Sequence, residues 1–169
     1  MTTNKVSVLI VCVLLAFSAA ANDSASKPES LKDFTTADQT ISKDVVVTAD
    51  KAWLIESKKA QTVRLFEVAE PGVEDCMVIY RAKIKTKDLK EPAYLEMWCR
   101  VSGRGEFFSR GLENTVSGSN DWASYETPFF LKKGQKPDLI KLNVVLKGGG
   151  KVWIKDVQLL KAPLPSQDK

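Results

Sequence analysis

The stretch Ala93–Val101, "AYLEMWCRV", alternates between two kinds of side chain and decides the fold class. One row is apolar: Leu95, Met97, Cys99 and Val101. The other is aromatic and charged: Tyr94, Glu96, Trp98 and Arg100. A period of two residues is typical of a β-strand with one buried face. We therefore expect the apolar row to face a core and the second row to face a ligand, another sheet or solvent.

Similar short runs of β-branched and aromatic residues, separated by turn signals, extend from "DVVVTA" to "KVWIKDVQLL". No segment shows a convincing helical period. With 169 residues, 44% of them hydrophobic and 27% charged, the chain suits one domain. We expect an all-β domain over residues 43–161, a two-sheet antiparallel β-sandwich of jelly-roll topology with eight or nine strands.

Residues 1–21 have the layout of a secretory signal peptide, with Lys5, an apolar run and small residues before Asn22. An uncleaved anchor helix is the alternative, but the run is shorter than the roughly 20 apolar residues that span a bilayer. We expect cleavage near Ala21, no transmembrane span afterwards, and a secreted or periplasmic protein of the cell envelope. Residues 22–42 are expected to be a polar spacer with one short edge strand near its end, and residues 162–169 a flexible tail.

The composition excludes several kinds of chemistry. The chain has no histidine, which removes Ser-His-Asp and Cys-His catalysis and the usual zinc ligand, although oxygen ligands for calcium remain. A net charge of +4 is too mild to indicate nucleic acid as a partner. Glu96 and Glu106 are the one carboxylate pair to consider for glycoside hydrolysis, but nothing in the sequence brings them together. We expect no enzymatic activity.

Two cysteines, Cys76 and Cys99, remain once the signal peptide is removed. If residues 76–85 and 93–101 pair as a hairpin around the polar run "TKDLKEP", Cys76 faces Cys99 and both point inward. We expect a disulfide between them, across neighbouring strands or across the core, with two buried thiols as the alternative. Consecutive strands of a jelly roll can also lie in opposite sheets. In that case the two segments do not pair, but Cys76 and Cys99 still point into the core.

The run "GGG" at residues 148–150 predicts a hairpin loop that sets Leu146 opposite Val152. Beyond Ile154, within the second of these strands, the apolar alternation slips by one residue, so that Val157 and Leu159 have the other parity. A β-bulge around Lys155 and Asp156 would return the later apolar residues to the core.

The outward row of the predicted hairpin is the best candidate ligand site. Its residues are Trp98, Tyr94, Arg81, Glu96 and Arg100. An aromatic ring can stack on the C–H face of a sugar while planar charged groups hold its hydroxyls. In the alternative, Trp98 is covered by a loop or by the N-terminal segment, and the charged residues form solvated ion pairs. Arg104, Glu106 and Arg110, in the glycine-punctuated stretch that follows, are weaker candidates.

The stretch Ser117–Lys161 resembles the closing strands of jelly-roll carbohydrate-binding modules of the galactose-binding-like superfamily. The matching elements include Gly118, the Asp121-Trp122 pair, Tyr125, Pro128-Phe129, Gly134, Gly148, Gly150 and "VWIKDVQL". The resemblance implies a β-sandwich that binds saccharide through exposed aromatic residues.

In many such modules an acid of the final strand helps to hold a structural calcium ion, which implies Asp156 here. An acid at a bulge can equally accept hydrogen bonds from backbone amides. The leading expectation is non-catalytic binding of a polysaccharide or other glycan. The alternative is a structural or protein-interaction domain that contacts envelope proteins and binds no small ligand.

Overall fold

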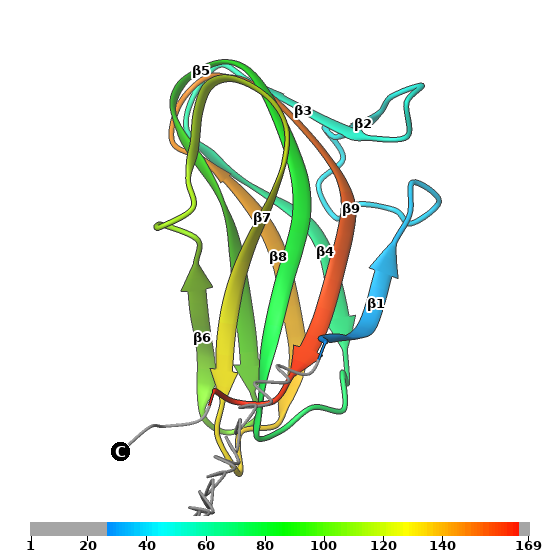
Figure 1. Cartoon of the computed structure of the whole chain (residues 1–169), viewed down its shortest axis with the longest axis vertical. Helices are drawn as coiled ribbons and strands as arrows, with labels where there is room; N and C mark the ends of the chain where they lie inside the picture. Colours follow the sequence, from blue (N-terminus) through cyan, green and yellow to red (C-terminus); the bar gives the residue numbers. More distant parts are fainter. Residues whose placement is uncertain (1–26, 166–169) are drawn as a thin grey trace, which may run out of the picture.

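The computed structural model describes residues 27–165, which form nine β-strands (Figure 1). Their bounds are β1 (Glu29–Phe34), β2 (Val46–Val47), β3 (Trp53–Ser57), β4 (Gln61–Ala69), β5 (Cys76–Val101), β6 (Gly105–Arg110), β7 (Val116–Leu131), β8 (Pro137–Leu146) and β9 (Gly150–Ala162). No helix capable of crossing a membrane occurs in this part of the chain. The expected signal peptide and the last four residues of the expected tail lie outside the described residues.

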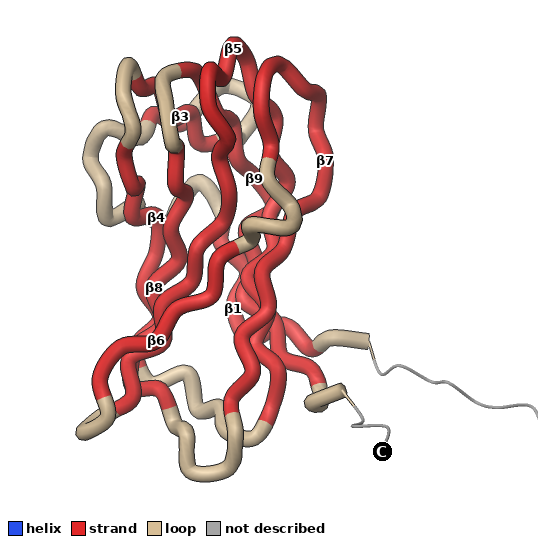
Figure 2. The backbone as a smooth tube through the Cα atoms, turned by 90° about the vertical axis from the view of Figure 1, so that its left-hand side faces the viewer, coloured by secondary structure: helices blue, strands red, loops and turns tan. Residues whose placement is uncertain are grey.

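The strand β5 belongs to both layers of the molecule. Its first half pairs with β7 and β9, and its second half pairs with β6 and β8. Sheet I therefore contains β7, the first half of β5, β9, β3 and β2, with β1 also paired to β9. Sheet II contains β6, the second half of β5, β8 and β4. Figure 2 shows β4, β6 and β8 on one side of the molecule and β1, β7 and β9 on the other, which confirms the predicted antiparallel β-sandwich.

The predicted hairpin between residues 76–85 and 93–101 is wrong. The polar run between them is part of the single strand β5 and crosses from sheet I to sheet II. Thr86, in the crossing segment, donates a hydrogen bond to the carbonyl of Gly118 and accepts one from the amide of Asn120. β7 therefore stays hydrogen-bonded to β5 where β5 passes from one sheet to the other.

The core lies between the two sheets, and the inward row of β5 is buried along its length. Val78 and Met97 have no exposed surface, and Leu95 is 1% exposed. Tyr80 is also fully buried. The inward parity predicted for both halves of β5 is therefore confirmed, although the halves face each other across the core instead of pairing side by side.

Cys76 and Cys99 are free, buried thiols in this structure, so the predicted disulfide is absent from it. The two residues lie in the halves of β5 that belong to different sheets and do not pair with each other. Burial raises the pKa of the Cys99 thiol to about 12, with a smaller contribution from Cys76. Burial likewise raises the pKa of Cys76. Both side chains therefore behave as small apolar groups of the core.

The glycines at 148–150 do not form the predicted hairpin. β8 pairs with β4 and β5, whereas β9 pairs with β1, β3 and β5, so this turn joins sheet II to sheet I. A Cβ added to Gly150 would lie 2.7 Å from the Cα of Leu89, in the crossing segment of β5. A glycine is needed at position 150 because the two crossings pack against each other here.

The predicted bulge in β9 is confirmed. Arg81 pairs with Gln158 and Lys83 pairs with Lys155, so β9 carries one extra residue between these pairs. Asp156 adopts a φ of 51°, as the bulged residue, and Val157 returns to the core with no exposed surface.

The strand β1 lies within the segment expected to be a spacer. It pairs with β9, and Phe34 at its end is buried, with its ring stacked on Phe66 at a centroid distance of 4.1 Å. Sheet I therefore already includes residues 29–34, ahead of the predicted start of the domain at residue 43.

Candidate functional site

The aromatic and charged row of "AYLEMWCRV" lies on the outer face of sheet II. On this face Trp98 pairs with Phe108 of β6 and with Lys141 of β8. Glu96, two residues earlier and therefore on the same face, pairs with Arg110 and Asn143. Two adjacent rows across three strands thus combine aromatic rings with hydrogen-bonding groups.

Glu96 is the centre of the polar network, although it is only 4% exposed. Its carboxylate accepts hydrogen bonds from Arg110 Nε at 2.7 Å, Trp98 Nε1 at 2.8 Å and Asn143 Nδ2 at 3.2 Å. Burial alone would raise the pKa of Glu96, but these three donors outweigh it and hold the pKa below its usual value. The carboxylate is therefore ionised at neutral pH and fixes the positions of its donors.

The aromatic part of the face is a stack of Trp98, Phe108 and Arg110. The rings of Trp98 and Phe108 are 5.0 Å apart at an angle of 48°. The guanidinium of Arg110 lies over the Phe108 ring, 4.3 Å from its centre. Because Glu96 holds both Trp98 and Arg110, the stack is fixed before any ligand arrives.

A depression of about 430 Å³ lies over Trp98 and Arg110, and we call it the outer-face depression. Its lining consists of Thr62, Arg64, Glu96, Trp98, Glu106, Arg110, Lys141 and Asn143. Each of its three cations has a carboxylate partner: Arg110 pairs with Glu96, Lys141 with Glu106, and Arg64 with Glu67. The depression therefore combines an aromatic surface with charges that are already neutralised.

Asn143 adds an acceptor at the floor of the outer-face depression. The residue is 5% exposed, and its Oδ1 atom has no hydrogen-bond partner within residues 27–165. A buried acceptor without a donor is costly, and such groups are uncommon in folded proteins. A ligand hydroxyl that reached this amide would satisfy it.

The structure brings together part of the predicted ligand set. Trp98 and Glu96 line the outer-face depression, and Trp98 is partly exposed. Arg100 lies on the same face one row further along and pairs with Asp138 at 2.8 Å. Tyr94 lies on the same face but is only 6% exposed, so little of its ring is open to a ligand.

Arg81 does not belong to this set. It lies on the outer face of sheet I, where it pairs with Glu126 at 2.8 Å. The prediction placed Arg81 beside Tyr94 because it assumed a hairpin. The crossing of β5 instead directs the outward rows of its two halves to opposite faces of the sandwich.

Sequence reasoning missed Phe108, Lys141 and Asn143 as site residues, and it gave Arg110 and Glu106 only a minor place. The glycines at 103, 105 and 111 pointed to a loop, whereas residues 105–110 form β6 beside β5. The alternation of Glu106, Phe108 and Arg110 in "GEFFSRG" is the signal that could have identified this strand.

The side chains around Asp156 do not favour the expected calcium ion, which stays a prediction. Its carboxylate pairs with the ammonium of Lys83 at 2.9 Å. No group of three acidic, cysteine or histidine side chains that could hold a metal ion occurs in the described part of the chain. Calcium takes six to eight oxygen ligands from carboxylates, carbonyl groups and water, and the carboxylate expected to hold the ion already faces the ammonium of Lys83.

We therefore expect thermal unfolding of the protein to be the same in calcium and in a chelator. Ligands that bind only the folded state raise the melting temperature, so an occupied site would separate the two curves. Differential scanning calorimetry at millimolar calcium and at millimolar EDTA measures this. A calcium-dependent rise that Asp156→Asn removes would show that the carboxylate does hold the ion.

Comparison with solved structures shows a shared fold. The chain is similar to the CBM22-1 xylan-binding domain of Paenibacillus barcinonensis Xyn10C, with a TM-score of 0.53 and 9% identity, over 83% of this chain and 99% of that one. It is also similar to the N-terminal CBM22-1 and GH10 modules of Clostridium thermocellum xylanase 10B, solved with xylohexaose, with a TM-score of 0.57 and 9% identity. That match covers 79% of this chain and 28% of the longer xylanase chain. No family model and no curated protein matches the sequence. The predicted likeness to jelly-roll carbohydrate-binding modules is thus confirmed at the level of the fold.

Proposed function

We propose that the outer face of sheet II binds a neutral glycan without changing it chemically. The observation that carries this proposal is the stack of Trp98 and Phe108 beside the fixed donors and acceptors of the outer-face depression. A sugar ring presents apolar C–H groups on its faces and hydroxyls around its rim. Aromatic rings and oriented polar groups match these two surfaces.

The ion pairs of the outer-face depression favour a neutral ligand over an acidic one. Arg110, Lys141 and Arg64 already have carboxylate partners, so an anionic sugar would have to compete with Glu96, Glu106 and Glu67 for them. Hydroxyl groups can accept hydrogen bonds from the remaining N–H groups without separating these pairs.

Binding without hydrolysis agrees with the state of the two carboxylates. A glycosidase needs one acid whose pKa is raised so that it can donate a proton. The pKa of Glu96 is lowered instead, and Glu106 is paired with Lys141. Support for glycan binding also comes from the fold, because the similar domain of Paenibacillus barcinonensis is described as xylan-binding.

We further propose that the protein is exported, because residues 1–21 have the layout of a secretory signal peptide.

The test is affinity electrophoresis and isothermal titration calorimetry with xylan, β-glucan, mannan and polygalacturonate. We expect binding to at least one neutral polysaccharide, and Trp98→Ala should weaken it by about tenfold or more, because it removes the larger ring of the stack. Trp122→Ala is the matched control, since Trp122 is also partly exposed but lies on β7 of sheet I, against Lys155. Preference for polygalacturonate, or equal binding by wild type and Trp98→Ala, would contradict the proposal. Silence across all four polymers would favour a structural or protein-interaction role.

A further inference from the structure

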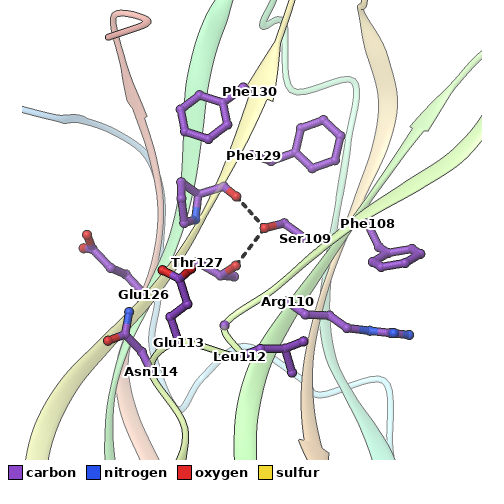
Figure 3. Close-up of a pocket in the computed structure, with 12 residues that line it drawn as sticks. Phe108, Ser109, Arg110, Leu112, Glu113, Asn114, Glu126, Thr127, Phe129 and Phe130 are labelled. Carbon is purple, nitrogen blue, oxygen red and sulfur yellow. Dashed lines mark hydrogen bonds between the residues drawn. The ribbon is translucent and has the colours of Figure 1, made fainter.

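A second and larger depression lies at the open edge of the sandwich, between β6 of sheet II and β7 of sheet I. We call it the edge groove, and its volume is about 540 Å³ (Figure 3). Its lining comes from residues 108–114 and 126–130. The Ser109 hydroxyl lies 2.9 Å from the Thr127 hydroxyl and donates to the carbonyl of Pro128, so the two sheet edges are joined at the floor of the groove.

The edge groove has the same combination of aromatic and polar groups as the outer-face depression. Phe130 is 49% exposed and Leu112 is 60% exposed, although both are apolar. Glu113 and Asn114 are exposed polar residues of the same lining, and Figure 3 shows them on the side of Thr127 away from Phe129 and Phe130. Exposed apolar side chains gathered in a hollow mark binding surfaces.

The edge groove is continuous with the outer-face depression through β6. Arg110 lines both, and Phe108, which stacks on Trp98, also lines the edge groove. β6 is the only described strand that separates them, because it is the outermost strand of sheet II. A polymer lying on the outer face can therefore pass over one strand and enter the edge groove.

We infer that the edge groove is the second part of one binding site, which an extended neutral polysaccharide fills after crossing β6. This inference rests on the proposed function and names its ligand as a long chain and not a short oligosaccharide. A short oligosaccharide occupies one depression, whereas a long chain contacts Trp98 and Phe108 at one end and Phe130 at the other.

The groove floor is unsuited to the main competing occupant, an added peptide strand. Strand addition needs a row of free backbone N–H and C=O groups along an edge. Pro128 has no N–H group, and its carbonyl already accepts from Ser109. A proline on an edge is a known obstacle to strand pairing. A saccharide needs no such row, because it binds through ring faces and hydroxyls.

The test is calorimetric titration of the full chain with xylotriose and xylohexaose, and with the matching oligosaccharides of cellulose and mannan. Phe130→Ala removes the far aromatic contact of the edge groove. Phe107→Ala is the matched control, because Phe107 is 41% exposed, lies on β6 and is not part of the groove lining. Both residues are well exposed, so neither substitution should disturb the core.

We expect wild type to bind the hexasaccharide at least about fivefold more tightly than the trisaccharide. Phe130→Ala should weaken binding of the hexasaccharide by about three- to tenfold and leave binding of the trisaccharide unchanged. Phe107→Ala should change neither. Equal affinity for the two lengths, or a Phe130→Ala variant that binds the hexasaccharide as wild type does, would overturn the inference while leaving Trp98-dependent binding intact. Trisaccharide binding that Trp98→Ala leaves unchanged would overturn the proposed function, and the inference with it.

Discussion

Replacing Glu96 with alanine is expected to lower the free energy of unfolding by about 2–3 kcal/mol and to abolish glycan binding. The substitution leaves Trp98 Nε1 and Asn143 Nδ2 without their acceptor, and Asn143 is only 5% exposed. Arg110 loses its partner too, but its side chain is 38% exposed and can be rehydrated, which limits the cost. Binding is lost because Glu96 fixes both the ring of Trp98 and the guanidinium of Arg110.

The effect of Glu96→Ala should depend on pH in a definite direction. The folded-state pKa of Glu96 lies below its unfolded value, which is about 4.3 for a free glutamate. The ionised carboxylate therefore stabilises the fold above that pH, and this contribution is lost as the pH falls through the folded-state pKa. The difference in urea stability between wild type and Glu96→Ala should narrow from pH 7 to pH 3.

Glu56→Ala serves as the control for this measurement. Glu56 also pairs with a cation, Lys151 at 3.0 Å, but its side chain is 60% exposed. Its loss should change the free energy of unfolding by less than about 1 kcal/mol. A difference for Glu96→Ala that stays constant across the pH range would show that the carboxylate does not stabilise the fold through its charge.

Gly150→Ala is expected to cost about 3 kcal/mol or more of unfolding free energy. The residue has a φ of 142°, which residues other than glycine rarely adopt. An added Cβ would also lie 2.7 Å from the Cα of Leu89 and 2.9 Å from the carbonyl oxygen of Asp88. Both are backbone atoms of the β5 crossing, so relief requires a shift of the strand that joins the sheets.

The matched control for Gly150→Ala is Gly103→Ala. Gly103 has a φ of 72°, but no heavy atom lies within 4 Å of its would-be Cβ. It therefore has an ordinary left-handed φ and no clash, and Gly103→Ala should cost only about 1 kcal/mol. Chemical denaturation of both variants measures the extra cost at Gly150. Equal losses for the two variants would mean that neither the φ of Gly150 nor the packing of the crossings adds to the cost.

The sequence predicted which face each side chain occupies better than it predicted which strands pair. A period of two residues reports the face of a strand, so the inward row from Cys76 to Val101 was identified correctly. The same period does not indicate which strand lies beside it. The polar run at 86–92 suits a hairpin turn and a crossing between sheets equally well, and the glycines at 148–150 are similarly ambiguous.

The candidate site was likewise predicted where only the face of a strand mattered, and missed where strand pairing mattered. Trp98 and Glu96 were found because they lie on the outward row of one strand. Arg81 was misplaced because its position depended on the pairing of two segments. Lys141 and Asn143 come from β8, which reads as a core strand in the sequence, and only its place beside β5 gives its outward residues a role.

The pairing of β1 with β9 also has a consequence for the time at which the chain can fold. These are the first and the last strands of the described residues, and Glu29 pairs with Lys161. β9 also lies between β3 and the first half of β5, so most of sheet I has no central strand until residues 150–162 have been synthesised. Contacts between such distant segments form slowly, because a long loop must close before they gain any stability. Folding of this sandwich should therefore begin only when synthesis of the domain is nearly complete, and an emerging chain will expose its apolar strands until then.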